Sequence, residues 1–572
     1  MLPWCQGRCS CRVNPCLTHS VLATYVYDDA PYVILYPQVM AGAESSLLLA
    51  LPDPCLLRVL QCCAADDYRS LFNAARAHSR LHQAAVVALR SIKKQVSPQQ
   101  ISGIMVYLGK HGQHLNSLDL RGDGSLNLLC HLPQQLRLSS LQFRGFSLQL
   151  QPANGLSGVL GAAAAVAALK QLRLDSCRVN DAGAAAALAA TLSQLPAGLE
   201  HLSISGLHGA FGTTWWQHRP NFPAGVLQQL PHLTYLELGG VFLVGPDKAH
   251  PALQQLQGLT GLAGLKLISL RGVVTCSMLA GMWRLTCLEL LGNMELEPGV
   301  LAGMTQLQHL CVGSCQIRGG AAGVAQLLAH MQPLQQLTHL SMGHSLRAVE
   351  GGNPSASAYA ALTASSKLQH LRISSCTLPA GMRWHLFPAG RQLPNLQFLD
   401  ISGVRQPTGE LAQAPEGSRL VSGCPGLQSL HIRHLRSPEL AIVQGLSALQ
   451  TLAFNGYTAE GWQAVCRLTG LRGLSVVGFG NYKEGALLQL TQLRQLTALH
   501  FESPIDGFPD GFDWAGEPYC LATASCPLVT LHLAHLLACG VRYGTFGSTR
   551  LIVVTTSGCE CPEGLPQHSH GF

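Results

Sequence analysis

The most regular feature of the chain is a short hydrophobic phrase, L-x-x-L-x-[L/I/V/F/M], that recurs from about Leu115 to Leu536. Clear copies begin at Leu115, Leu169, Leu199, Leu233, Leu285, Leu307, Leu368, Leu427, Leu496 and Leu528. Alternate residues of a strand point to opposite faces, and the phrase alternates leucine with polar residues over its last positions. We therefore expect one short β-strand in each phrase, with the first, fourth and sixth positions pointing into a hydrophobic core.

The spacing of the phrase predicts how these strands are connected. About 16 copies lie roughly 22 to 34 residues apart, and the chain resembles leucine-rich repeat solenoids and their longer variants in this period. Ala- and Leu-rich segments at 183–195 and 320–331 predict helices on the convex side. The units of about 22 residues from Leu427 to Leu471 leave room only for a turn or a short 3-10 helix. The expected fold class is α/β, a leucine-rich repeat solenoid (horseshoe) of about 16 repeats.

Residues 51–89 show a helical pattern and no copy of the phrase. Pro52 stands where a proline commonly opens a helix, and a cluster of apolar residues follows it over little more than one turn. A second apolar face follows Asp66 and Asp67, acids that suit a helix N-terminus. A third segment, 83–92, is rich in Ala, Val and Leu. We expect three short helices here, forming a small N-terminal all-α box.

This helical segment resembles an F-box over about 40 of the 572 residues. The resemblance is carried by Leu51, Pro52, Asp53, Leu56, Val59, Leu60, Asp67, Leu71 and the segment from Ala74 to Leu81. The segment departs from the family pattern where Pro54 replaces an acid, Ala75 a cysteine and His78 a tryptophan. The resemblance implies that a Skp-type adaptor would dock on Leu51, Pro52, Leu56, Val59, Leu60 and Leu71. Alternatively, the helices only cap the first repeat, because the end of a solenoid must be covered.

The expected domains are an irregular Cys-rich tail at 1–45, an F-box-like helical domain at 46–95, the solenoid at 100–545 and an irregular tail at 546–572. Metal-ligand side chains gather in both tails, namely Cys5, Cys9, Cys11 and Cys16 in the first and Cys559, Cys561, His568 and His570 in the second. Their spacings do not match a standard zinc module. We therefore predict no metal site and no cofactor.

Composition excludes several classes of protein. Apolar residues make up 47% of the chain and charged residues 12%, which excludes global disorder. The net charge of +7 is spread thinly and forms no basic stripe, so we expect no nucleic-acid partner. No window of about 18 apolar residues is present, which argues against a membrane span.

The cysteine pattern and the N-terminal segment bear on where the protein works. The first twenty residues lack the unbroken apolar run of a secretory signal. Cys177, Cys315 and Cys376 follow strands at an inward position of the repeat, where a side chain can bond turn backbone groups, so they are predicted to be structural thiols. We expect a cytoplasmic protein; the nucleus, or the ciliary axoneme and cytoskeleton, are the alternatives.

The concave side of the predicted sheet offers a candidate partner surface. His309, His339 and His370 take the same position in three successive repeats, and neighbouring strands lie about 4.8 Å apart, so their rings should form a ladder. His431 and two further histidines lie one column over. Such a ladder could bind a metal or sense pH, because protonated rings repel one another, or it could be an ordinary solvated face.

Charged residues and loops extend this candidate surface. Charges of both signs, including Arg372, Asp400 and Arg433, suit a mixed polar protein surface. Two insertions carry residue types that are common at binding hot spots: Trp215, Trp216 and Arg219 in one, and Trp514 in the other. These loops either bind a partner or fold back on the solenoid edge.

No catalytic motif is present, so the chain is predicted to be non-enzymatic. The F-box resemblance implies a substrate-recognition adaptor of an SCF-type (cullin-based) E3 ubiquitin ligase, a monomer within that complex whose repeats hold an unknown protein substrate. The alternative is a leucine-rich repeat scaffold for protein–protein interaction, in the cytosol or on a ciliary axoneme. A receptor ectodomain would need a signal peptide and paired cysteines.

Overall fold

The structure is a computed structural model, and its two compact units are Met1–Leu233 and Thr234–Phe572. It describes residues 23–27, 30–34, 90–122, 127–128, 136–148, 167–179, 192–206, 208–209, 225–239, 256–269, 272–346, 354–373, 386–387, 391–402, 423–434, 443–455, 459–477, 492–502, 530–534 and 552–554. No helix within these ranges has the length and apolar character that crossing a lipid bilayer requires.

The first unit contains a parallel sheet, in which five described strands follow one another in chain order. These are β3 (Ser91–Gln95), β4 (Ser117–Arg121), β6 (Ser140–Arg144), β8 (Gln171–Asp175) and β10 (His201–Ser205). A second parallel sheet joins the two-residue strands β5 (Asn127–Leu128), β7 (Ser147–Leu148), β9 (Arg178–Val179) and β11 (His208–Gly209). Two further strands, β1 (Ala23–Tyr27) and β2 (Ala30–Ile34), pair antiparallel within the segment that was predicted to be irregular.

The described helices of the first unit are α5 (Pro98–His111) and the 3-10 helices η2 (Gly112–His114) and η4 (Leu227–Gln229). Pro98 opens α5, where a missing backbone N–H costs nothing. The Gln100 side chain accepts a hydrogen bond of 3.4 Å from the backbone N–H of Ser97, the residue before the helix. Leu108 of α5 is fully buried, so this helix contributes to the core beside β3 and β4.

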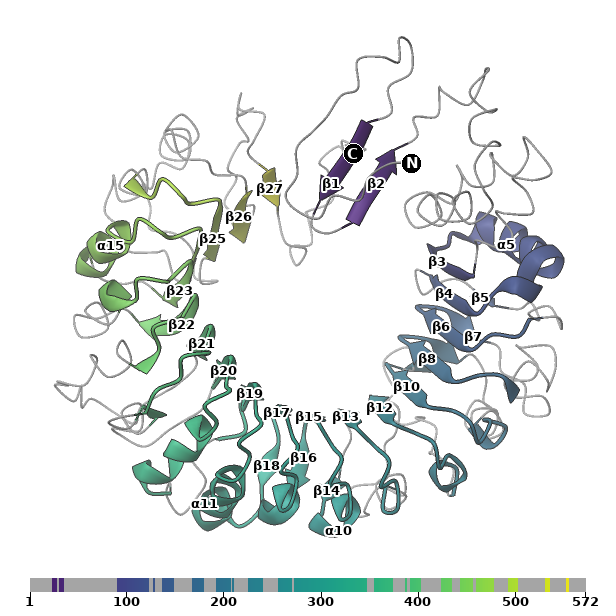
Figure 1. The fold of residues 1–572 in the computed structure, drawn as a ribbon, viewed down its shortest axis with the longest axis horizontal. Helices are drawn as coiled ribbons and strands as arrows, with labels where there is room; N and C mark the ends of the chain where they lie inside the picture. The colour runs from purple at the N-terminus through teal and green to yellow at the C-terminus, as the bar shows by residue number, and fades with distance from the viewer. Residues whose placement is uncertain are drawn as a thin grey trace, which may run out of the picture. The chain divides into compact units, whose positions relative to one another are not determined.

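The second unit contains thirteen described parallel strands, again in chain order. They are β12 (Tyr235–Gly239), β13 (Gly264–Ile268), β15 (Cys287–Leu291), β17 (His309–Gly313), β19 (His339–Ser341), β20 (His370–Arg372), β21 (Phe398–Ile401), β22 (Ser429–His434), β23 (Thr451–Asn455), β24 (Gly473–Val477), β25 (Ala498–Glu502), β26 (Thr530–Ala534) and β27 (Ile552–Val554). A smaller parallel sheet joins β14 (Gly272–Val274), β16 (Met294–Leu296) and β18 (Gln316–Ile317). Figure 1 traces this order along the chain.

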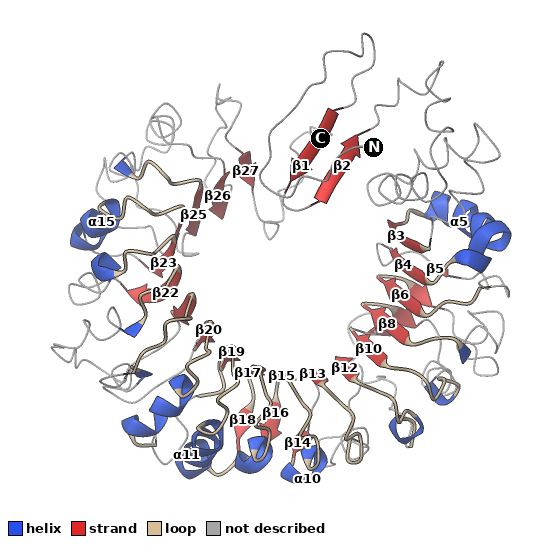
Figure 2. Ribbon diagram, viewed as in Figure 1, coloured by secondary structure: helices blue, strands red, loops and turns tan. Residues whose placement is uncertain are grey.

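The described helices of the second unit are α10 (Cys276–Leu279), η5 (Pro298–Leu301), α11 (Gly320–Met331), η6 (Ala356–Thr363) and α15 (Ala459–Cys466). They lie on one side of the large sheet, drawn blue beside the red strands in Figure 2. The opposite side of the strands therefore carries side chains that these helices do not cover.

The strands confirm the predicted leucine-rich repeat fold. Sixteen strands, β4 through β26 in the two large sheets, each coincide with one copy of the phrase. The sheets also extend past the predicted solenoid limits of 100 and 545: β3 pairs with β4 and β27 pairs with β26. Neither added strand carries the phrase. Such strands can still join the sheet, because strands pair through backbone groups and need no leucines. Ile92, which was predicted to end a helix, lies instead in β3 opposite Leu118.

Leucines at the first, fourth and sixth positions form the core, as predicted. In one repeat Leu307 and Leu310 are fully buried and Val312 is 1% exposed. Neighbouring strands place Leu288, Leu310 and Leu340 in register, so each leucine packs on its counterpart in the next repeat. Burying one such side chain contributes about 1.5–3 kcal/mol, and the repetition of that gain holds the strands in register.

The turns that follow β8, β17 and β19 use a buried thiol or hydroxyl to satisfy backbone carbonyls. The Cys315 thiol donates to the carbonyl oxygens of Leu290 (3.4 Å) and Gly313 (3.5 Å). The Cys177 thiol bonds in the same way, and Ser345 plays this part in the repeat after Cys315. The predicted structural role is thus confirmed for Cys177 and Cys315, and Cys376 lies outside the described residues.

The helix predictions were right in one place and wrong in another. α11 begins at Gly320 and ends at Met331, as predicted, whereas most of 183–195 lies outside the described residues. The unit of about 22 residues from Leu449 contains α15, an eight-residue α-helix, so the prediction of a turn or 3-10 helix there was wrong. Ala464, Val465 and Cys466 at its C-terminal end are buried, and this packing stabilises a full α-turn in a short repeat.

Candidate functional site

The candidate site lies on the uncovered face of β12 to β22, where the third and fifth positions of the phrase project. We call the stacked third-position rings His309, His339, His370 and Phe398, with His431 at their end, the ring column. We call the fifth-position residues Glu237, Lys266, Glu289, Cys311, Ser341, Arg372 and Asp400 the charge column. Parallel register places each residue beside its counterpart in the next strand.

The ring column is a continuous row of five rings in contact. Ring centroids lie 5.4 Å apart for His309 and His339, 5.6 Å for His339 and His370, and 4.0 Å for His370 and Phe398. The last pair is almost parallel, at 1°, and His431 meets Phe398 edge-on at 4.9 Å. The predicted histidine ladder is therefore confirmed, and Phe398 joins it to His431, which the sequence placed one column over.

Burial lowers the pKa of three histidines in the ring column, namely His339, His370 and His431. The pKa of His370 is lowered to about 4, mainly by burial and then by the neighbouring His339 and Arg372. The negative charge of Asp400 acts in the opposite direction and raises this pKa. Burial followed by the charge of His309 also lowers the pKa of His339. Burial likewise lowers the pKa of His431. Neutral imidazoles can stack without the repulsion that protonated rings would feel.

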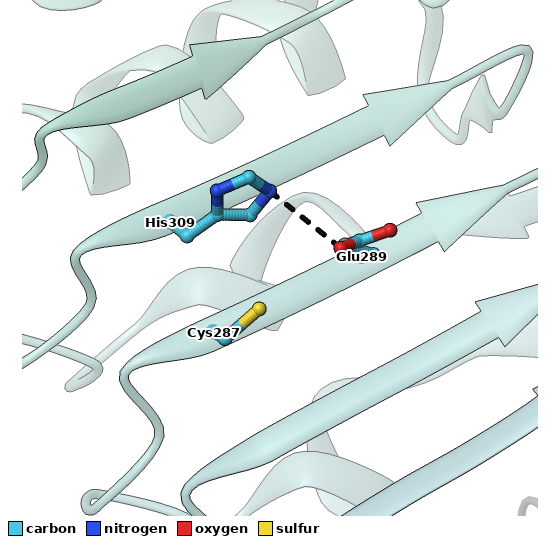
Figure 3. A group of neighbouring side chains, drawn as sticks. All are labelled: Cys287, Glu289 and His309. Atoms are coloured by element: carbon cyan, nitrogen blue, oxygen red, sulfur yellow. Dashed lines mark ion pairs between the residues drawn. The ribbon is translucent and has the colours of Figure 1, made fainter. Parts of the chain in front are cut away.

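The charge column begins with three ions of alternating sign. Lys266 Nζ lies 3.1 Å from Glu289 Oε2 and 3.9 Å from Glu237 Oε1. The other oxygen of Glu289, Oε1, lies 3.7 Å from His309 Nε2, as the dashed line in Figure 3 shows. Glu289 therefore connects the charge column to the ring column. Glu237 is 4% exposed, and the Lys266 ammonium offsets part of the cost of burying its carboxylate.

A second ion pair flanks the other end of the rings. Arg372 Nε lies 3.1 Å from Asp400 Oδ2. The other oxygen of Asp400, Oδ1, accepts hydrogen bonds from the Ser402 hydroxyl (2.7 Å) and the Ser402 backbone N–H (3.0 Å). Asp400 is 3% exposed, and these three contacts compensate its burial. The predicted surface residues Arg372 and Asp400 thus form one unit rather than two independent contacts.

The remaining predicted site residues are only partly covered by the structure. Arg433 lies in β22, and its side chain is outside the described part. The F-box-like residues and the two tryptophan loops also lie outside it: Leu51, Pro52, Leu56, Val59, Leu60, Leu71, Trp215, Trp216, Arg219 and Trp514. Sequence reasoning missed Cys287 and Phe398, although both take the third position of their phrases, which was the available signal.

The two columns together resemble a protein-binding surface in their chemistry. The rings offer apolar faces with polar edges, and the ions beside them offer both signs of charge. Aromatic residues are enriched at the centre of protein interfaces and charged ones are depleted there, whereas rims are polar.

Comparison with known proteins gives only broad similarity: no family model matches the chain, and no curated protein does so either. An internalin, InlF, of Listeria monocytogenes is 14% identical over 77% of this chain and 96% of that one, with a TM-score of 0.33. A leucine-rich repeat protein of Leptospira interrogans is 16% identical over 82% and 92%, with a TM-score of 0.34. TLR13, in its complex with ssRNA13, is 15% identical over 78% and 72%, with a TM-score of 0.34. Since these scores are below 0.5, the fold assignment rests on the strands and buried leucines of this chain.

Proposed function

We propose that the protein is a non-enzymatic leucine-rich repeat scaffold that binds another protein on the uncovered face of β12 to β22. The observation that carries this proposal is the ring column, a row of five adjoining rings that crosses five neighbouring strands. The partner would cover the rings with an apolar patch and meet Lys266 and Arg372 with acidic side chains. Such an arrangement would place a desolvated centre inside a polar rim.

A pair of double variants of the full chain tests the scaffold proposal. His339→Ala/His370→Ala removes the middle of the ring column, and His232→Ala/His330→Ala removes two histidines outside it. Proteins captured by each variant are quantified by mass spectrometry, and the affinity of a captured partner is then measured after purification. We expect at least a roughly tenfold loss of affinity for the first variant only, as at a binding hot spot. Equal affinity of the two variants would place binding elsewhere.

The sequence supports a more specific role for this scaffold. The F-box-like residues of the segment 46–95 would dock a Skp-type adaptor, and the protein would then deliver its bound partner to an SCF-type E3 ubiquitin ligase. The chain would catalyse nothing itself; it would raise the effective concentration of substrate lysines near the conjugating enzyme. We expect such a complex in the cytoplasm or the nucleus.

Adaptor binding by the full-length chain tests this role separately. A Leu56→Asp/Leu60→Asp variant puts two charges on the proposed docking face, while His339→Ala/His370→Ala leaves that face intact. Adaptor that is retained by the wild type and the histidine variant, and lost by the Leu→Asp variant, supports the ligase role. If the wild type binds no adaptor, the ligase role is wrong and the scaffold proposal is unaffected.

A further inference from the structure

Three metal-ligand side chains meet at the first end of the ring column. Cys287 and Glu289 lie two residues apart on β15 and so share one face, and register places Cys287 directly opposite His309 on β17. The Cys287 sulfur, a Glu289 oxygen and a His309 ring nitrogen all lie within 4.8 Å of one another. Figure 3 shows the three side chains above the same pair of strands.

We propose that Cys287, Glu289 and His309 form a zinc-binding site with its fourth coordination position open on the uncovered face of the sheet. Thiolate, imidazole and carboxylate are the three donors that proteins use for Zn²⁺. Bonds of about 2.0–2.3 Å at tetrahedral angles hold such donors about 3.5 Å apart. The donors must therefore approach one another by about 1 Å, which rotations of the Cys, Glu and His side chains can supply without moving the strands.

The two oxygens of Glu289 have separate partners, and this division suits a metal. Oε2 is paired with Lys266 at 3.1 Å, whereas Oε1 faces His309 at 3.7 Å. Oε1 is thus the oxygen available to a cation that His309 also binds. The Lys266 ammonium opposes a second cation nearby, so it would weaken the site without occupying a ligand position.

A neighbouring thiol, that of Cys311, is not counted among the proposed ligands because it has another partner. Cys311 lies opposite Glu289 in register, but its thiol is hydrogen-bonded to the Ser341 side chain on β19, the strand on the far side of β17 from Cys287. The Cys287 thiol is free of any disulfide, and burial together with the Glu289 charge raises its pKa to about 11. Zinc would have to displace this proton, so binding should release a proton and strengthen as the pH rises.

Protection of Cys287 from alkylation by Zn²⁺ in the full-length protein tests the site directly. The modification rate of each cysteine is followed by peptide mass spectrometry, which separates Cys287 from the cysteines near the two ends of the chain. We expect saturating Zn²⁺ to slow alkylation of Cys287 at least about tenfold and to leave Cys276, an exposed cysteine of α10, unchanged. Equal alkylation of Cys287 with and without Zn²⁺ would overturn the proposal.

Variants then identify the ligands. His309→Gln and Glu289→Gln should each reduce the protection of Cys287, while Lys266→Met should lower the Zn²⁺ concentration required for it by several-fold, because an opposing charge is removed. With Co²⁺ as probe, Cys287→Ser should bind one equivalent less than Cys276→Ser and lose the corresponding thiolate-to-cobalt absorption. None of these variants alters the buried residues Leu288 and Leu310 beneath the site, and circular dichroism checks the fold. Full protection of Cys287 in His309→Gln would contradict the assignment.

Discussion

Replacing His370 with phenylalanine would remove a proton-binding group from the ring column and keep an aromatic ring in its place. The Phe398 ring is parallel to that of His370 within 1° at 4.0 Å, and His339 stacks on the other side at 5.6 Å. A phenyl ring at position 370 can continue this stack. The variant therefore separates the effect of protonation from the loss of a contact.

The expected effect follows from the lowered pKa of His370, about 4 in the folded chain against 6.5 for an ordinary histidine side chain. The unfolded chain binds the proton first as the pH falls, so the stabilisation is complete above about pH 6.5 and is lost progressively down to about pH 4. The pKa difference, 6.5 − 4 = 2.5, corresponds to at most about 3.4 kcal/mol at 1.36 kcal/mol for each pH unit. Because the ring is partly exposed, solvent screening reduces the expected loss to about 1–2 kcal/mol.

Hydrogen exchange of the amides in β19, β20 and β21 measures the local loss of stability as the pH falls, after correction for intrinsic exchange rates. Between about pH 7 and about pH 5, the free energy of local opening should fall by about 1 kcal/mol more in the wild type than in His370→Phe. His232→Phe, at an exposed histidine outside the column, should behave as the wild type does. The same pH dependence in His370→Phe and the wild type would refute the linkage between ring burial and stability.

Four further substitutions, two of them with matched controls, test the charges, the core and a turn. Arg372→Met should raise the pKa of His370 and Asp400→Asn should lower it, because the two charges act on the ring with opposite signs. NMR titration of the His370 ring measures both pKa changes. Changes in the same direction would contradict this prediction. Leu310→Ala should destabilise the chain by about 2–5 kcal/mol in urea unfolding, against less than about 0.5 kcal/mol for the exposed neighbour Gln308→Ala. Gly292→Ala should lower the free energy of unfolding more than Gly303→Ala. Both glycines have positive φ, but of the two only Gly292 would bring a Cβ against backbone, 2.7 Å from Ser269 Cα. Equal losses in the two variants would show that the turn relaxes.

The sequence predicted the histidine ladder of His309, His339 and His370 within the ring column, because parallel register is fixed by the repeat itself. Equal phrases place the third position of one strand beside the third position of the next, so His309, His339 and His370 had to be neighbours once each phrase was a strand. The leucine positions could be predicted for the same reason. Alternation within a strand then determines which residues face the core and which face away from it.

Side-chain direction and local helix formation could not be predicted in this way. Register places Cys287 opposite His309 and Cys311 opposite Glu289, so each thiol lies near both of these residues, yet the donor group that meets is Cys287, Glu289 and His309, while the Cys311 thiol interacts with Ser341. That choice depends on rotamers, which the repeat pattern does not specify. α15 forms in a unit where length alone predicted a turn, because Val465 and its neighbours are buried. The role of the F-box-like segment stays a prediction.

The core and surface positions of the phrase have separate roles, which explains how one face can carry many functional side chains. Core leucines and backbone pairing stabilise each strand, so the third and fifth positions can vary without loss of the fold. A column built only of phenylalanine would present a large apolar patch, which promotes aggregation. Histidines with lowered pKa values such as His339 and His370 avoid this problem, because they expose neutral ring faces with polar edges near neutral pH. Acid would charge these rings and set them against one another, so a partner that binds the ring column should be released as the pH falls.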